Sequence, residues 1–248
     1  MPANILTPRN LRALAGFAAS NVLVAFDYDG TLAPIAATPA TARMRTTTRR
    51  WLTQVARRYP CVVISGRPLD DLAARLRRIP VWYLFGNHGF EPHGGSDEHA
   101  SRVRDWVTRL HDQLPATQGL VIEQKKYSVT VHYRHVRNKE RLMQMIVEAV
   151  RQLPDARPIG GAKAINLLPR GGADKGIAVQ QARRMFACDT VIYVGDDDTD
   201  EDAFVSASPD RLLSIRIGSR GSTRARFRLR TQREVDLLLK HLLQFRTR

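Results

Sequence analysis

The chain has 248 residues, 43% of them hydrophobic, which is enough for a sizeable core in an ordinary soluble globular protein. The net charge of +15 raises nucleic acid as a partner, but the basic residues are scattered and are not clustered with interleaved aromatic residues, so we expect no nucleic-acid site. The densest basic run, residues 224–230, alternates as an exposed edge strand does, and we interpret it as solvated surface.

An apolar run at residues 22–26 predicts a buried strand, and the motif Asp27-Tyr28-Asp29-Gly30 follows it directly. Ligands of parallel α/β sheets bind at the carboxyl ends of the strands, so both acids lie where a reaction centre is expected. Asp27 can attack a phosphorus while bound to a metal, and Asp29 lies on the same side of the chain, where it can protonate the leaving oxygen. An Asx-rich turn after a strand is the alternative interpretation.

Ser65 follows the second predicted strand, residues 61–64, and precedes a helix that begins near Leu69. The hydroxyl of Ser65 and the free amides of the turn at Gly66 and Arg67 can hold phosphate oxygens, as the starts of helices do. A structural N-cap is the alternative role for Ser65.

The third predicted strand, residues 81–85, is followed by the polar residues Asn87, His88 and Glu91. These side chains again follow the carboxyl end of a strand, where they can bind sugar hydroxyls or orient a phosphate. A merely packed or solvated histidine is the alternative for His88.

The pattern changes at about residue 92, where a block of different character begins. Its predicted elements are a hairpin, a helix and a strand, at residues 120–134, 138–153 and 163–168. The second hairpin strand alternates with period two, as a half-buried antiparallel strand does. We interpret residues 92–169 as a mobile cap inserted into a core domain made of residues 1–91 and 170–248.

The core resumes with a predicted helix that Asp174 can cap and Lys175 opens. A strand at residues 191–195 follows, and it ends in a cluster of acids. The acids of this cluster include Asp196, Asp197, Asp198 and Asp200.

These motifs, in this order, resemble those of the haloacid dehalogenase superfamily of phosphohydrolases. The resemblance implies an α/β fold with a Rossmann-like parallel-sheet core and an inserted α/β cap. It also implies phosphomonoester hydrolysis through an aspartyl-phosphate on Asp27, with Asp29 as acid and base. Magnesium would be held by Asp27, the backbone carbonyl of Asp29 and Asp196, with Asp197 and Asp200 in support. The groups implied to orient the phosphoryl oxygens are Lys175, Ser65 and the amide of Gly66.

Longer stretches of the core and the insert are similar to bacterial trehalose-6-phosphate phosphatases. The matching stretches are residues 26–35, 86–91, 122–125, 132–134 and 195–204. Glu123 and Lys125 share one face of their predicted strand, where an exposed opposite-charge pair is the ordinary interpretation. The resemblance implies instead that they grip the disaccharide, while Asn87 lies beside the phosphate. The remaining candidate substrate contacts are Arg67, His88, Glu91 and Arg134.

One position departs from that family's pattern, since Asn166 stands where the family usually has an acidic residue. An asparagine keeps the hydrogen bonding but loses the charge, which bears on sugar recognition. We expect a magnesium-dependent phosphatase acting on trehalose 6-phosphate, with a glycosyl-glycerate phosphate or sucrose phosphate as the alternative substrate. A sugar phosphomutase and a catalytically silent sugar-phosphate sensor are further alternatives.

The expected surroundings of the protein follow from what the sequence lacks. No stretch of about 18 apolar residues occurs, so we expect no membrane span. Cys61 and Cys188 lie far apart and form neither a disulfide framework nor a metal pattern, which fits a reducing cytoplasm. We expect a monomer whose partner is a small-molecule sugar phosphate.

Overall fold

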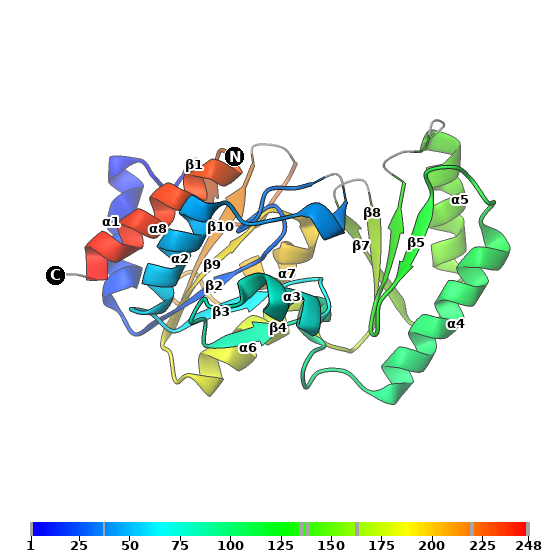
Figure 1. Cartoon of the computed structure of the whole chain (residues 1–248), viewed down its shortest axis with the longest axis horizontal. Helices are drawn as coiled ribbons and strands as arrows, with labels where there is room; N and C mark the ends of the chain where they lie inside the picture. Colours follow the sequence, from blue (N-terminus) through cyan, green and yellow to red (C-terminus); the bar gives the residue numbers. More distant parts are fainter. Residues whose placement is uncertain are drawn as a thin grey trace. The chain divides into compact units, whose positions relative to one another are not determined.

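The computed structural model, drawn in Figure 1, describes residues 2–36, 38–133, 136, 139–161, 164–218 and 221–246. The chain forms two compact units, one made of residues 1–89 and 174–248 and the other of residues 90–173. The sequence predicts the insert at residues 92–169, and the second unit extends beyond these limits on both sides. Among the described residues, no helix is long and apolar enough to cross a membrane.

A seven-stranded sheet forms the centre of the first unit, in the order β1-β11-β10-β9-β2-β3-β4, and its pairs are parallel. Its strands are β1 (Ala3–Asn4), β2 (Val22–Phe26), β3 (Cys61–Ile64), β4 (Tyr83–Phe85), β9 (Thr190–Gly195), β10 (Leu212–Ile217) and β11 (Phe227–Leu229). Every residue of β2 is buried, because both faces of the parallel sheet are covered. A strand in this position is therefore apolar along its whole length. The predicted Rossmann-like core is confirmed.

Helices cover both faces of this sheet. The α-helices are α1 (Pro8–Ala19), α2 (Thr46–Ala56), α3 (Leu69–Leu76), α6 (Lys175–Met185), α7 (Glu201–Phe204) and α8 (Val235–Arg246), and the 3-10 helices are η1 (Pro39–Thr41), η2 (Asn87–Gly89), η3 (Asp198–Asp200) and η4 (Gln232–Glu234). Val24 and Phe26 of β2 pack on the side of α1, α2 and α8, whereas Leu23 and Ala25 pack on the side of α6 and α7. This two-sided packing holds the strand that ends at the first motif.

The basic run at residues 224–230 is not an exposed edge strand, so that prediction is wrong. Within the run, β11 lies between β10 and β1, and Phe227, Arg228 and Leu229 are buried. The strand β1, which covers the outer side of β11, has only two residues and comes from the other end of the chain. Such a short pairing between distant segments leaves no signature in the local sequence.

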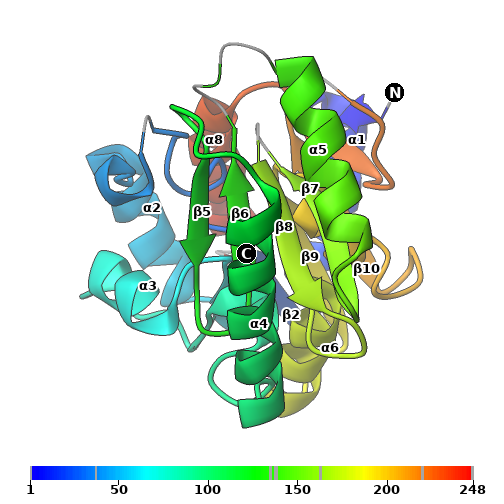
Figure 2. The ribbon, with the colours of Figure 1, turned by 90° about the vertical axis from the view of Figure 1, so that its right-hand side faces the viewer.

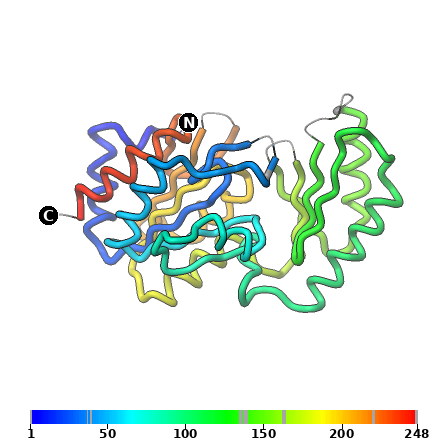
Figure 3. The backbone as a smooth tube through the Cα atoms, in the orientation of Figure 1, coloured from blue at the N-terminus to red at the C-terminus, as the bar shows by residue number. Residues whose placement is uncertain are grey.

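The second unit has its own antiparallel sheet, in the order β5-β6-β8-β7. Its elements are α4 (Asp97–Gln113), β5 (Val121–Gln124), β6 (Val129–His132), α5 (Lys139–Arg151), β7 (Ala156–Gly161) and β8 (Ala164–Pro169). Both helices pack on the same face of the sheet, as Figures 2 and 3 show, and Trp106 is fully buried in this core. We did not predict β7, whose sequence contains Pro158 and two glycines, residues that strands disfavour.

Candidate active site

Two neighbouring strands end in acids at the carboxyl edge of the core sheet. β2 pairs with β9 so that Phe26 lies opposite Val194, and Asp27 and Asp196 follow these adjacent strand ends. The amide of Asp27 donates to the Val194 carbonyl oxygen at 2.9 Å, which extends the pairing into the first motif. Carboxylate oxygens of Asp27, Asp196 and Asp200 lie within 4.8 Å of one another.

Two glycines allow this close approach. The φ angle of Gly30 is 79°, and a Cβ at this position would lie 2.0 Å from a carboxylate oxygen of Asp196. A Cβ at Gly195 would lie 2.3 Å from Cγ of Asp200. Larger residues at these positions would therefore force the acids apart.

Lys175 is buried between two of the acids. Its Nζ donates to Oδ1 of Asp27 at 2.9 Å and to Oδ1 of Asp200 at 2.6 Å, and its side chain is only 3% exposed. Asp174 sets the start of α6, because its side chain accepts a hydrogen bond from the Ile177 amide at 2.8 Å. Burial lowers the pKa of Lys175, but Asp200 and Asp27 outweigh this effect and hold the pKa above its ordinary value. The lysine therefore stays charged.

The acids carry more negative charge than one lysine balances. Burial raises the pKa of Asp27, although Lys175 opposes this effect. Burial and the charges of Asp27 and Asp200 likewise raise the pKa of Asp196 well above its ordinary value. Carboxylates this close are stabilised by a bound cation, and an all-oxygen donor set suits a hard divalent ion.

Asp200 and Asp197 organise the cluster. Oδ1 of Asp200 also accepts from the Tyr193 hydroxyl at 2.7 Å, and its Oδ2 accepts from the amides of Asp196 and Asp197, both at 2.9 Å. Asp197 caps η3 by accepting from the Asp198 amide at 2.9 Å, and burial raises its pKa to about 6. With so many donors on Asp200, the side chains of Asp27 and Asp196 are better suited to direct contact with a cation.

Ser65 and Gly66 follow β3, the neighbour of β2 in the sheet. Ser65 is buried, and its Oγ accepts from the amide of Arg67 at 3.3 Å. His88 packs against Gly66, since a Cβ there would lie 2.5 Å from the imidazole ring. Asn87 and His88 both have positive φ angles, and their amides donate to the carbonyl oxygens of Arg67 (2.7 Å) and Ser65 (2.8 Å). Through these bonds, η2 braces the turn that carries Ser65.

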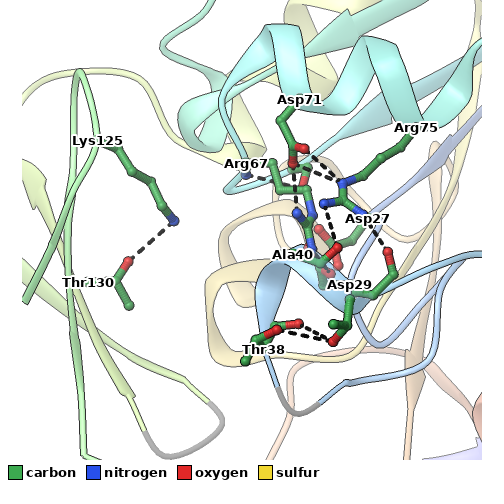
Figure 4. A network of polar contacts seen from close by, with 12 residues as sticks. Asp27, Asp29, Thr38, Ala40, Arg67, Asp71, Arg75, Lys125 and Thr130 are labelled. Carbon is green, nitrogen blue, oxygen red and sulfur yellow. Dashed lines mark hydrogen bonds and ion pairs between the residues drawn. The ribbon is translucent and has the colours of Figure 1, made fainter. Parts of the chain in front are cut away.

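Arg67 binds the second acid of the first motif. Its Nε and Nη2 donate to Oδ2 and Oδ1 of Asp29 at 2.6 and 2.7 Å, as Figure 4 shows. Its Nη1 donates to Asp71 at 2.7 Å. We expected Arg67 to contact the substrate, and we did not single out Asp71. The spacing of four residues between Arg67 and Asp71 is the sequence signal for this pair.

The second unit gathers polar residues across three strands of its sheet. Register places Thr130 of β6 opposite Glu123 of β5 and Asn166 of β8. Thr130 Oγ1 donates to Asn166 Oδ1 at 3.0 Å. It also accepts from Lys125 Nζ at 3.3 Å, as Figure 4 shows. Glu123 Oε2 lies 2.8 Å from His132 Nε2 and 3.9 Å from Lys125 Nζ. We call these five residues the polar sheet face.

Glu91 lies at the start of this unit and is partly buried, whereas Arg134 lies outside the described residues. We did not predict Thr130 or His132 as site residues. Their alternation along β6 is the pattern that places them on one face of the strand.

A family model and several curated proteins are similar in sequence to this chain. A family model described as Trehalose-phosphatase matches residues 25–232, which include part of the first unit and the whole of the second. The trehalose-phosphate phosphatase of Mycolicibacterium paratuberculosis is 36% identical over 204 residues, and that of Mycobacterium ulcerans is 32% identical over 221 residues. These matches cover 76% and 82% of this chain but 52% and 56% of the relatives, so the chain spans about half their length.

Solved structures share the fold. The C-terminal domain of C. albicans trehalose-6-phosphate phosphatase has a TM-score of 0.77 at 23% identity, and the match covers 98% of this chain and 99% of that one. Aspergillus fumigatus trehalose-6-phosphate phosphatase has a TM-score of 0.65 at 24% identity, with coverages of 98% and 99%. At these identities the likeness establishes the fold alone.

Proposed function

The chain belongs to the trehalose-phosphatase family, and from this premise we propose that it hydrolyses trehalose 6-phosphate to trehalose and phosphate. One observation carries the proposal. Asp27 is buried at the end of a parallel strand, bonded to Lys175 and beside Asp196, where a phosphoryl group would meet a nucleophile and positive charge together. The names of the relatives support the choice of substrate.

In the first step, an oxygen of Asp27 attacks the phosphorus, and the bond between phosphorus and the sugar oxygen breaks. Asp29, protonated for this step and released from one of its two bonds to Arg67, gives its proton to the sugar oxygen, which leaves free trehalose and an aspartyl-phosphate on Asp27. Lys175, the Ser65 hydroxyl and the Gly66 amide would hold the phosphoryl oxygens, because phosphoryl transfer depends mainly on positioning and charge stabilisation.

In the second step, water attacks the phosphorus of the aspartyl-phosphate. Asp29, now ionised, takes a proton from this water, and the bond between phosphorus and Asp27 breaks. Phosphate leaves, and both acids return to their starting states. One carboxyl therefore serves as acid and then as base, which its place two residues after the nucleophile permits.

We also propose that Asp27, Asp196 and the backbone carbonyl of Asp29 bind magnesium. The support is the buried cluster of carboxylates, whose raised pKa values a divalent cation would reverse. When bound, the ion would supply positive charge to the phosphoryl group. Asp200, which accepts from the amides of Asp196 and Asp197, would keep the ligands in place.

We propose that the second unit is a cap and that its polar sheet face binds the sugar. This face offers both signs of charge and hydroxyl and amide groups, which suit a molecule rich in hydroxyls. The neutral Asn166 favours one second candidate, a phosphatase for a glycosyl-glycerate phosphate or sucrose phosphate. The further contacts proposed are Asn87, His88, Glu91 and Arg134. The cytoplasm is the proposed location, which the two buried free thiols fit.

The test is phosphate release from a panel of sugar phosphates, with magnesium and after chelation. Trehalose 6-phosphate should give the highest kcat/KM, and chelation should remove the activity. Asp27→Asn, measured in parallel, excludes a contaminating phosphatase. A higher kcat/KM on another sugar phosphate would favour the second candidate, and release from none of the panel would refute a phosphatase.

A further inference from the structure

A ladder of alternating charge begins just before α3 and continues along it. Nη1 of Arg67 donates to Oδ2 of Asp71 at 2.7 Å, and Nε of Arg75 donates to both oxygens of Asp71 at 2.9 and 3.0 Å. The members are four residues apart, so the side chains meet on one face. Figure 4 shows the Asp71 carboxylate bonded to both guanidinium groups.

The ladder joins the first motif to the segment between η1 and α2. At one end, two nitrogens of Arg67 hold both oxygens of Asp29, and the guanidinium lies over the ring of Tyr28, 5.5 Å from its centroid. At the other end, Arg75 donates to the carbonyl oxygen of Ala42. The ladder therefore connects Asp29, the proposed acid and base, through the side chains of Asp71 and Arg75 to the segment between η1 and α2.

The negative charge of Asp71 is important because the two arginines that it contacts are largely buried. The side chains of Arg67 and Arg75 are 8% and 15% exposed, whereas the side chain of Asp71, the carboxylate that they share, is 38% exposed. Without its charge, two largely buried guanidinium groups would lie side by side, and Arg67 would lose a charge-assisted hydrogen bond. Such bonds are about twice as strong as neutral ones, so Asp71 contributes to the direction of the Arg67 side chain, together with Asp29 and the ring of Tyr28.

We propose that Asp71 is a positioning residue for proton transfer by Asp29. Asp71 fixes one nitrogen of Arg67, and Arg67 in turn fixes both oxygens of Asp29. The proposal rests on the function proposed above, in which Asp29 protonates the leaving oxygen. A reacting group displaced by about an ångström loses much of its effect, so a group that acts only through Arg67 can still set the rate.

The test uses the dependence of kcat/KM on the leaving group. Asp71→Asn keeps the shape and removes the charge, and Asp70→Asn is the matched control on the same turn of α3, where Asp70 is exposed. For Asp71→Asn we expect kcat/KM to fall about tenfold on trehalose 6-phosphate and phenyl phosphate. On 4-nitrophenyl phosphate we expect a loss below about threefold, because a good leaving group departs without a proton. Asp70→Asn should match the wild type on all three.

A carboxylate at position 71 should restore kcat/KM, so Asp71→Glu should recover most of the activity on phenyl phosphate. Equal losses on the two aryl phosphates, or no loss on either, would overturn the proposal. So would an identical result for Asp70→Asn. If Asp71→Asn does not fold, Arg75→Gln tests the ladder from its other end. For this variant we expect kcat/KM to fall about threefold on phenyl phosphate and less on 4-nitrophenyl phosphate.

The two proposals can fail separately. A wild-type protein that hydrolyses both aryl phosphates but not trehalose 6-phosphate would refute the proposed substrate. The comparison of phenyl with 4-nitrophenyl phosphate would then still decide the role of Asp71, because it involves no sugar.

Discussion

The polar clusters of the two units differ in how firmly they are held. In the core, the side chains of Asp27, Lys175 and Asp200 are at most 6% exposed and are joined by bonds of 2.6 and 2.9 Å. On the polar sheet face, Thr130 and Asn166 are buried, but the side chains of Lys125 and Glu123 are 12% and 34% exposed. Glu123 lies 2.8 Å from His132, which is 31% exposed, and 3.9 Å from Lys125. Removing a member of the core cluster leaves a buried charge, whereas water can reach the polar sheet face. The core is therefore intolerant of change, and the polar sheet face has room to alter specificity.

The largest effect should come from Asp27→Asn, which removes the proposed nucleophile. Turnover should fall by roughly 10⁴-fold or more, and the acid-labile phosphoenzyme should disappear. Phosphate release and trapping of labelled phosphate on the acid-quenched protein measure both effects. Asp210→Asn, at an exposed position, is the control. Wild-type turnover by Asp27→Asn would show that the nucleophile is another group.

Lys175→Met should come next, because it leaves Asp27 and Asp200 buried without a counter-charge. We expect turnover to fall about 10²- to 10³-fold and the free energy of unfolding to fall by about 3–5 kcal/mol. Phosphate release and urea denaturation measure the two quantities. Arg184→Met, at an exposed position on the same helix, should change both quantities far less. A small change in both turnover and the free energy of unfolding would show that the core cluster tolerates substitution as well as the polar sheet face does.

Glu123→Ala tests the polar sheet face. We expect kcat/KM on trehalose 6-phosphate to fall about tenfold while the value on 4-nitrophenyl phosphate barely changes, since the lost contact is to the sugar. The free energy of unfolding should change by less than about 1 kcal/mol, because the group is partly exposed. Glu148→Ala, on the same unit and 63% exposed, is the control. Equal losses on both substrates would contradict a role in sugar recognition.

The smallest effect is expected from Asn166→Asp, which restores the acid typical of the family. A carboxylate can still accept from Thr130 and can make charge-assisted bonds to hydroxyls, so trehalose 6-phosphate should bind several-fold more tightly, by about 1 kcal/mol. Steady-state KM and inhibitor binding measure this change. Weaker binding of trehalose 6-phosphate, together with better native turnover of another sugar phosphate, would favour the second candidate function.

Much of the core could be predicted because its signals are local. The continuous apolar runs of β2 and β9 mark strands covered on both faces, and polar residues directly after them mark the reactive edge of the sheet. The strands β1 and β7 could not be predicted in the same way. β1 has two residues, and β7 contains residues that strands disfavour, so tertiary pairing decides both.

The order of the motifs, the parallel core and the candidate nucleophile could be predicted from the sequence, because residue type and periodicity carry this information. The partners of the charged groups became known only from the folded chain. Arg67 holds Asp29 and Asp71, and Lys175 joins Asp27 to Asp200. These pairings depend on which segments meet in space at hydrogen-bonding distance, and a linear pattern does not specify distances between segments far apart in the chain.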